Sequence, residues 1–98
     1  MATPTTTADQ FRLVAEYVSS GAWRAPLTND EKLVLYALYK QATEGALDAE
    51  RTRRPNGVLD PRGAAKYDAW CELGQLTREA AREAYIQEFH NYRARYGK

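Results

Sequence analysis

The 98-residue chain carries 14 lysines and arginines against 13 aspartates and glutamates, which gives a formal net charge of +1 at pH 7. This length predicts a single domain over residues 1–98, and a hydrophobic content of 44% is too high for a disordered chain. The balanced charge argues against a nucleic-acid partner, which would need a broad basic surface. It still allows a few lysines to converge on a small phosphate ligand.

The single cysteine, Cys71, excludes an intrachain disulfide and favours a reducing compartment. Residues 1–10 are polar and lack the basic and apolar regions of a signal peptide. The longest apolar run, residues 33–38, is far shorter than the ~20 residues needed to span a bilayer. We therefore expect a cytoplasmic protein whose residues 1–7 are flexible.

The first predicted helix covers about residues 8–20, with Thr7 as its N-cap. Its apolar side chains recur at i, i+3, i+4 and i+7, so they form one stripe along the helix. The stripe consists of Phe11, Val14, Ala15 and Val18. Gly21 favours a left-handed residue after the helix, and Pro26 prevents its continuation.

The second predicted helix covers residues 28–44 and ends at Gly45. Thr28 and Glu31 have the spacing of a capping box, in which each side chain bonds the backbone N–H of the other. Apolar positions occupy more than half of the circumference of this helix, so we expect it to be central. Leu33, Tyr36, Ala37 and Lys40 recur at i, i+3, i+4 and i+7 and share one face.

Two interpretations of Lys40 are open from the residues alone. The ordinary one is a lysine that lays its methylenes on the core and extends its ammonium to water. The other is an anion site, because an ammonium beside phenols suits a phosphate that is attached to a flat ring. Tyr36, one turn away on the same face, supplies such a phenol.

The third and fourth predicted helices cover residues 61–74 and 77–95. Asp60 is the expected cap of the third helix, and Lys66 and Trp70 lie one turn apart on it. The fourth carries one apolar face made of Ala81, Tyr85, Phe89 and Tyr92. No segment alternates like a strand, so the chain should be all-α, an up-and-down bundle with one long crossover.

Catalytic and metal-binding constellations are weak in this sequence. His90 is the only histidine and Cys71 has no cysteine partner, so no structural-metal signature is present. A Cys71–His90 dyad is conceivable, but a helical cysteine of this kind is usually buried and inert. Glycine patterns of phosphate and dinucleotide loops are missing from the sequence as well. We expect no enzymatic activity, no metal and no cofactor.

Four motifs in order resemble the acyl-CoA-binding protein family. The run "YALYKQAT" at 36–43 is similar to the family's signature helix, and "GAAKYDAW" at 63–70 is similar to its third-helix motif. The stretches "EAYI" at 83–86 and "FRLVAEYV" at 11–18 resemble the fourth and first helices. Together the motifs cover about residues 8–96.

The resemblance implies a four-helix up-down-down-up bundle that binds a medium- or long-chain fatty acyl-CoA without catalysis. It further implies that Lys40 and Lys66 bind the phosphates of coenzyme A, above all the 3′-phosphate. The hydroxyl of Tyr36 would join them, and Tyr39 and Tyr85 would hold the adenine end. Such a carrier would be a monomer that meets acyl-CoA-using enzymes or membranes transiently.

The resemblance also places Leu33 and Ala15 beside the acyl chain. The sequence departs from the family pattern nearby: Lys32 replaces an apolar residue, Ser19 a basic one and Ala64 a lysine. These departures leave the head-group residues in place. The alternative function is a helical protein-interaction module that has lost its ligand.

A basic cluster lies in the long connection between the second and third helices. It contains Arg51, Arg53 and Arg54. Because other charges of the family pattern are missing, we hypothesise that Arg53 or Arg54 supplements the phosphate contacts.

Overall fold

The computed structural model describes residues 6–98, and residues 1–5 of the segment expected to be flexible lie outside the described residues. The described part consists of helices and connections, with no strand. The helices are α1 (Thr7–Ser19), α2 (Asn29–Glu44), α3 (Pro61–Glu72) and α4 (Arg78–Tyr96). The predicted all-α class is confirmed. No helix in the described range has the length and apolar character that a membrane crossing requires.

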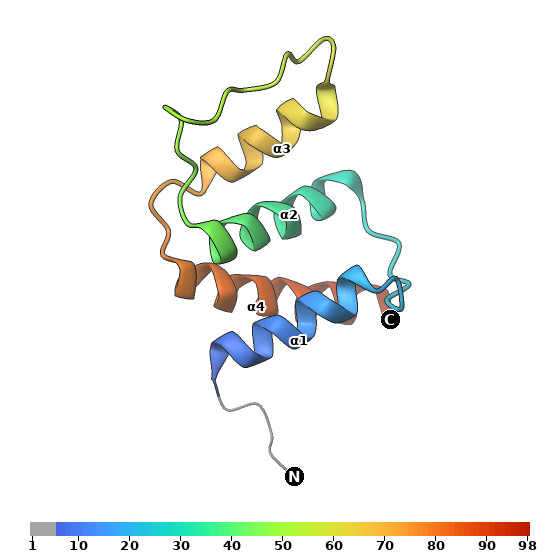
Figure 1. Ribbon diagram of the computed structural model, residues 1–98. Coiled ribbons are helices and arrows are strands. Elements are labelled where there is room, and N and C mark those ends of the chain that lie inside the picture. The colour runs from blue at the N-terminus through green and yellow to red at the C-terminus, as the bar shows by residue number, and fades with distance from the viewer. Residues whose placement is uncertain (1–5) are drawn as a thin grey trace.

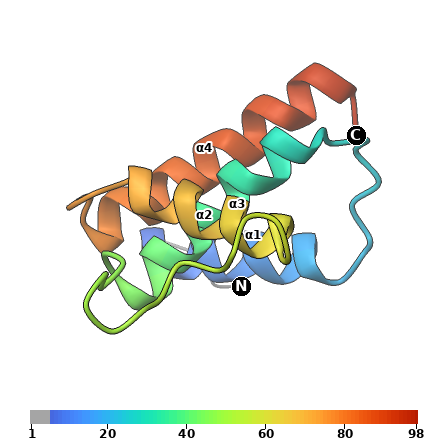
Figure 2. The same ribbon diagram turned by 90° about the horizontal axis from the view of Figure 1, so that it is seen from above.

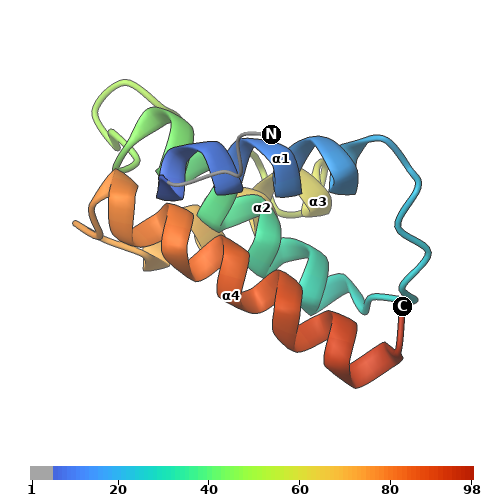
Figure 3. The same ribbon diagram turned by 90° about the horizontal axis from the view of Figure 1, so that it is seen from below.

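The helices form an up-down-down-up bundle. In Figure 1, α1 and α4 run in one direction, and α2 and α3 run in the other. Helix α2 lies in the middle, with α3 on one side and α4 on the other, and α1 packs against α4. Figures 2 and 3 show the same layers from above and from below, with α3 and α1 on opposite sides of α2. The predicted central position of the second helix is therefore confirmed.

Local chemistry sets the helix starts. The Thr28 hydroxyl accepts a hydrogen bond from the Glu31 N–H at 3.1 Å, and the Glu31 carboxylate accepts one from the Thr28 N–H at 2.8 Å, so the predicted capping box is present. Helix α1 differs, because Thr6 rather than Thr7 accepts from the Asp9 N–H and caps it. Helix α3 ends at Glu72, earlier than expected, and a turn through Gly74 follows.

The core is built on the apolar faces of α2 and α4. The predicted face of α4 is confirmed, since its four members are all buried: Ala81, Tyr85, Phe89 and Tyr92. Helix α1 contributes only Phe11 to the fully buried set, while Val14, Ala15 and Val18 are partly exposed. The stripe on α1 is therefore only partly covered, which leaves room for a ligand on its α2 side.

The C-terminal end of α2 is fixed by side chains that cap backbone carbonyls. Gln41 is fully buried, and its amide donates hydrogen bonds to the carbonyls of Gly74 at 3.0 Å and Leu76 at 2.7 Å. The indole of Trp70 donates to the Gly45 carbonyl at 3.0 Å. These bonds tie α2 to α3 and to the α3–α4 turn, so they set the position of the residues near the end of α2.

The opposite end of α2 is held by a buried carboxylate. Glu31 is 8% exposed, and it accepts hydrogen bonds from the Tyr96 hydroxyl and the Arg95 guanidinium of α4. The hydrogen bond from Tyr96, followed by that from the Thr28 backbone, lowers the pKa of Glu31 from 4.5 to about 2. The capping box and the link between α2 and α4 therefore use the same ionised group.

Replacing Glu31 with glutamine is expected to reduce the loss of stability in acid. A carboxyl whose pKa is lower in the folded than in the unfolded chain stabilises the fold when ionised. Its contribution is complete above pH 4.5 and is lost as the pH falls toward about 2. Urea midpoints should therefore fall more steeply for the wild type than for Glu31→Gln from about pH 6 down to about pH 3. Glu79→Gln, which removes an exposed charge, is the control, and equal slopes for wild type and Glu31→Gln would contradict the assignment.

Candidate functional site

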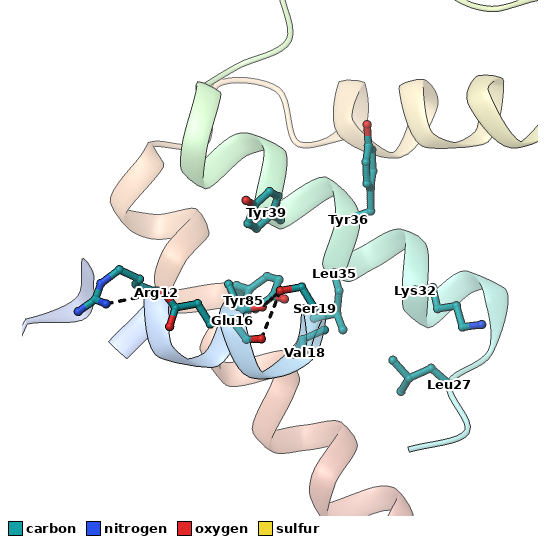
Figure 4. A pocket seen from close by; sticks show the side chains of 11 residues that line it. Arg12, Glu16, Val18, Ser19, Leu27, Lys32, Leu35, Tyr36, Tyr39 and Tyr85 are labelled. Carbon is teal, nitrogen blue, oxygen red and sulfur yellow. Dashed lines mark hydrogen bonds and ion pairs between the residues drawn. The ribbon is translucent and has the colours of Figure 1, made fainter. Parts of the chain in front are cut away.

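A cavity of about 610 Å³ opens between α1 and α2, with α4 contributing Tyr85. It contains four of the residues predicted to bind the ligand: Ala15, Tyr36, Tyr39 and Tyr85. Figure 4 shows Tyr39 of α2 and Tyr85 of α4 at one end of this cavity and Leu27 and Lys32 at the other. We call this space the first cavity.

Three aromatic rings meet at the Tyr85 end of the first cavity. The Phe11 ring lies edge-on to Tyr85 at 5.2 Å and 5.9 Å from Tyr39, and the two tyrosine rings are 6.4 Å apart. Tyr85 is 3% exposed, whereas Tyr39 is 44% exposed. A large aromatic face is thus available to a partner while its position is fixed by buried neighbours. Burial, with a smaller effect of Tyr39, raises the pKa of Tyr85 to about 12, which keeps its hydroxyl protonated.

A second cavity, of about 420 Å³, lies between the N-terminal parts of α2 and α3. It contains the predicted residues Leu33, Tyr36 and Lys66. Tyr36 and Lys32 line both cavities, so the two spaces adjoin each other. Figure 4 shows the Tyr36 side chain pointing from α2 toward α3. The second cavity is the continuation of the first toward α3.

Lys66 and Tyr36 form the cationic part of the second cavity. The Lys66 ammonium lies 5.2 Å from the centroid of the Tyr36 ring, which is a cation–π distance. Arg62, one turn earlier on α3, lines the same cavity and brings a second positive charge. The two positive charges of Lys66 and Arg62, together with the Tyr36 hydroxyl, make an environment that suits an anion.

Lys40 lies outside both cavities, and its role as a phosphate ligand stays a prediction. Its ammonium forms an ion pair with Glu44 one turn later and lies 5.1 Å from the centroid of the Trp70 ring. It lines neither cavity, and Lys66 rather than Lys40 lies over the Tyr36 ring. The hydrogen bond that the ammonium donates to the Glu44 carboxylate is the main cause that raises the pKa of Lys40. A phosphate that reached this lysine would have to compete with the Glu44 carboxylate.

The two residues expected beside the acyl chain lie in different cavities. Ala15 of α1 lines the first cavity, and Leu33 of α2 lines the second. The two cavities adjoin at Lys32 and Tyr36, and the contact of Leu33 and Ala15 with the acyl chain stays a prediction. The first cavity has an apolar wall that the sequence reasoning did not assign, made of Val18, Leu27 and Leu35. Val18 belongs to the apolar stripe expected on α1, but nothing local marked Leu27.

The departures from the family pattern and the missed cations also border these cavities. Lys32 lines both cavities and Ser19 lines the first, so both departures fall where a ligand would lie. Ala64, by contrast, is buried. Arg12, which sequence reasoning did not select, lines the first cavity and forms an ion pair with Glu16 at 3.7 Å.

The long connection does not bring Arg54 to the cavities. Its guanidinium donates two hydrogen bonds to the Asp68 carboxylate, at 2.8 and 2.9 Å, and the same contact raises the pKa of Arg54 and lowers that of Asp68. The bidentate geometry uses the donors that a phosphate would need. The hypothesis of a phosphate contact is thus unsupported for Arg54. For Arg53, which is exposed, it stays a prediction.

Cys71 is exposed rather than buried, contrary to expectation. Among residues 6–98, no group of three or more His, Cys, Asp or Glu side chains is placed to hold a metal ion.

Comparison with known proteins decides the family. A family model described as acyl CoA binding protein matches residues 8–89. The chain belongs to the acyl-CoA-binding protein family. Among solved structures, the rice (Oryza sativa) acyl-CoA-binding protein 2 superposes with a TM-score of 0.78 at 29% identity, over 92% of this chain and 93% of that one. The family's bundle and its general capacity to bind acyl-CoA therefore apply to this chain.

Two curated relatives contain the same domain within longer chains. Human enoyl-CoA delta isomerase 2 is 52% identical over 58 residues, which are 59% of this chain and 14% of the isomerase. Mouse acyl-CoA-binding domain-containing protein 5 is 46% identical over 61 residues, which are 62% of this chain and 11% of that protein. The chain thus matches only a small part of either relative. The family is a non-catalytic binding domain, and the isomerase match falls on the part that resembles it.

Proposed function

We propose that this protein is a non-catalytic carrier and pool-former that binds medium- and long-chain fatty acyl-CoA esters with high affinity. The single observation that supports it most is the arrangement of Tyr36 between two adjoining cavities, with Lys66 over its ring on one side and Tyr39 and Tyr85 on the other. A nucleotide phosphate, its base and an acyl chain each find a matching surface there.

The phosphates are assigned to the α2–α3 side. The Lys66 ammonium supplies charge at the mouth of the second cavity, and the Tyr36 hydroxyl can donate a hydrogen bond to a phosphate oxygen. Lys40, one turn along α2 from Tyr36, would join them once its ammonium left Glu44. The 3′-phosphate is the group proposed for this position.

The adenine and the acyl chain are assigned to the first cavity. The half-exposed Tyr39 ring offers a face on which a base can stack, and Tyr85 supports it from beneath. The apolar wall of Val18, Leu27 and Leu35 would remove the methylenes of the chain from water, which stabilises binding by about 0.8 kcal/mol for each fully buried CH₂. Lys32 lines both cavities, and its charge should limit how the acyl chain enters the first cavity.

Several features support a binding role without chemistry. The residues that line the two cavities include neither a histidine nor a cysteine, the residues considered for a dyad. Cys71 and His90 lie on separate helices outside them. We further propose that the protein acts as a cytoplasmic monomer in fatty-acid metabolism, which transports the ester to enzymes or membranes.

Calorimetric titration tests the proposal directly. Palmitoyl-CoA should bind tightly, while free coenzyme A and palmitate should each bind far more weakly, because each fills only one part of the site. A parallel titration with octanoyl-CoA measures how much the apolar wall contributes. Absence of palmitoyl-CoA binding by folded protein would overturn the carrier and favour the protein-interaction module.

A further inference from the structure

Two neighbouring apolar side chains in the α2–α3 connection are almost entirely exposed. Val58 is 89% exposed and Leu59 is 84% exposed, whereas the other exposed large apolar residues of the described chain lie between 40% and 45%. Single exposed apolar residues are common on protein surfaces. An adjacent pair with so little contact to the protein has no role in packing, and it leaves a small apolar tip in water.

The turn that carries this pair is organised by hydrogen bonds. The Asn56 side-chain oxygen accepts from the N–H groups of Val58 at 2.8 Å and Leu59 at 3.1 Å, which is an Asx-type turn. The Asp60 N–H then donates to the Asn56 carbonyl at 2.7 Å, and Asp60 caps α3 through the Gly63 N–H at 3.0 Å. The backbone thus holds both side chains outward at the start of α3.

The tip lies beside the second cavity. Pro61 and Arg62 line that cavity, and Leu59 is only two residues before Pro61, so their Cα atoms are at most about 7 Å apart. Figures 1 and 2 show the connection returning along α3 to the N-terminal end of that helix. A surface that covers the Val58–Leu59 tip therefore lies close to the second cavity.

Positive charges flank the tip on both sides. Arg53 precedes it and Arg62 follows it, both are exposed, and neither forms an ion pair with another described residue. Arg54 adds a third positive charge nearby, although Asp68 neutralises it. The exposed Asp60 carboxylate, which caps α3, adjoins Leu59, so the two free arginines leave the tip with an excess of positive charge of one. Apolar side chains beside an excess of positive charge suit the surface of an anionic bilayer.

We propose that the Val58–Leu59 turn is a membrane anchor that inserts these two side chains into an anionic phospholipid surface and sets the second cavity against it. The purpose of the anchor, which is exchange of acyl-CoA with a bilayer, rests on the proposed carrier function, whereas membrane binding itself does not. Two apolar side chains and two free arginines give weak, reversible binding, as a carrier that must leave the membrane requires.

Vesicle co-sedimentation of the ligand-free full chain tests the anchor. The vesicles contain phosphatidylcholine with one third phosphatidylserine. At low salt, the double variant Val58→Ser/Leu59→Ser should partition at least about tenfold less than the wild type, because both inserted side chains are lost. The matched control Leu13→Ser/Val34→Ser removes two exposed apolar side chains from α1 and α2, and it should partition like the wild type.

Three results would overturn the anchor. They are absence of vesicle binding by the wild type, equal binding by the Val58→Ser/Leu59→Ser variant, and a loss of palmitoyl-CoA affinity by that variant in vesicle-free solution. The last would place the two side chains on the acyl chain instead of the membrane. Since the vesicle assay contains no acyl-CoA, failure of the anchor and failure of the carrier function are distinguished. A vesicle-negative protein whose variant delivers acyl-CoA more slowly to an enzyme would assign the tip to a protein partner.

Discussion

Replacing Lys40 with methionine is expected to weaken palmitoyl-CoA binding by about ten- to a hundredfold at low salt. The ammonium lies one turn beyond Tyr36 on the same face of α2, and a charge-assisted hydrogen bond to phosphate would be lost with it. Methionine keeps an unbranched stem that can still pack on Trp70, so the variant should remain folded. Isothermal titration calorimetry measures the affinity, and thermal unfolding without ligand checks the fold.

The variant Glu44→Gln separates the ammonium from its ion pair. This substitution removes the ion pair between Glu44 and Lys40 but keeps the ammonium of Lys40. The affinity for palmitoyl-CoA should therefore equal that of the wild type or rise by up to about fivefold. A palmitoyl thioester of coenzyme A that lacks the 3′-phosphate should bind wild type and Lys40→Met nearly equally. Unchanged affinity of Lys40→Met for palmitoyl-CoA, or a loss in Glu44→Gln as large as in Lys40→Met, would show that Lys40 does not contact the phosphate.

The fold was largely predictable because its signals are local. The Thr28–Glu31 box, Asp60 before Pro61, and the apolar face of α4 each specify a helix within a few residues of sequence. The start of α1 was misplaced by one residue for the same reason. Thr6 and Thr7 offer identical hydroxyls, and Thr6 is the cap because its own backbone is extended whereas Thr7 is already helical.

The site was less predictable because it depends on contacts between helices. Spacing along α2 correctly places Tyr36 and Lys40 on one face, but it does not tell which lysine meets the phenol. The structure assigns Lys66 of α3 to Tyr36 and directs Lys40 to Trp70. Both choices follow from the way α3 packs on α2, a geometry that no single helical pattern contains.

The residues of the signature motif have two different roles, which the sequence alone does not distinguish. In the "YALYKQAT" run, Tyr36 and Tyr39 line the first cavity, whereas Gln41 is buried and bonds the carbonyls of Gly74 and Leu76. Helical spacing alone does not distinguish these two roles, because the carbonyls that Gln41 bonds are 33 and 35 residues away along the chain. Part of the family resemblance therefore reflects the support of the site rather than contact with a ligand.

Replacing Gln41 with alanine should destabilise the protein by about 2–4 kcal/mol, because it leaves two carbonyls without their donor and opens a cavity. The Gln41→Met variant keeps most of the side-chain volume and also removes the amide oxygen, which has no hydrogen-bond partner among the described residues. The Gln41→Met variant should therefore lose less stability than Gln41→Ala. Urea unfolding at constant m-value measures both.

Thr43→Ala is the matched control for this prediction within the same run. The Thr43 hydroxyl is exposed and donates only to carbonyls of its own helix, the nearer being that of Tyr39 at 2.9 Å, so its loss should cost less than about 0.5 kcal/mol. If Gln41 positions the end of α2, Gln41→Ala should also weaken palmitoyl-CoA binding, since Tyr39 and Lys40 lie on the turn that it anchors. A Gln41→Ala protein with wild-type stability would show that the two carbonyls do not need this amide.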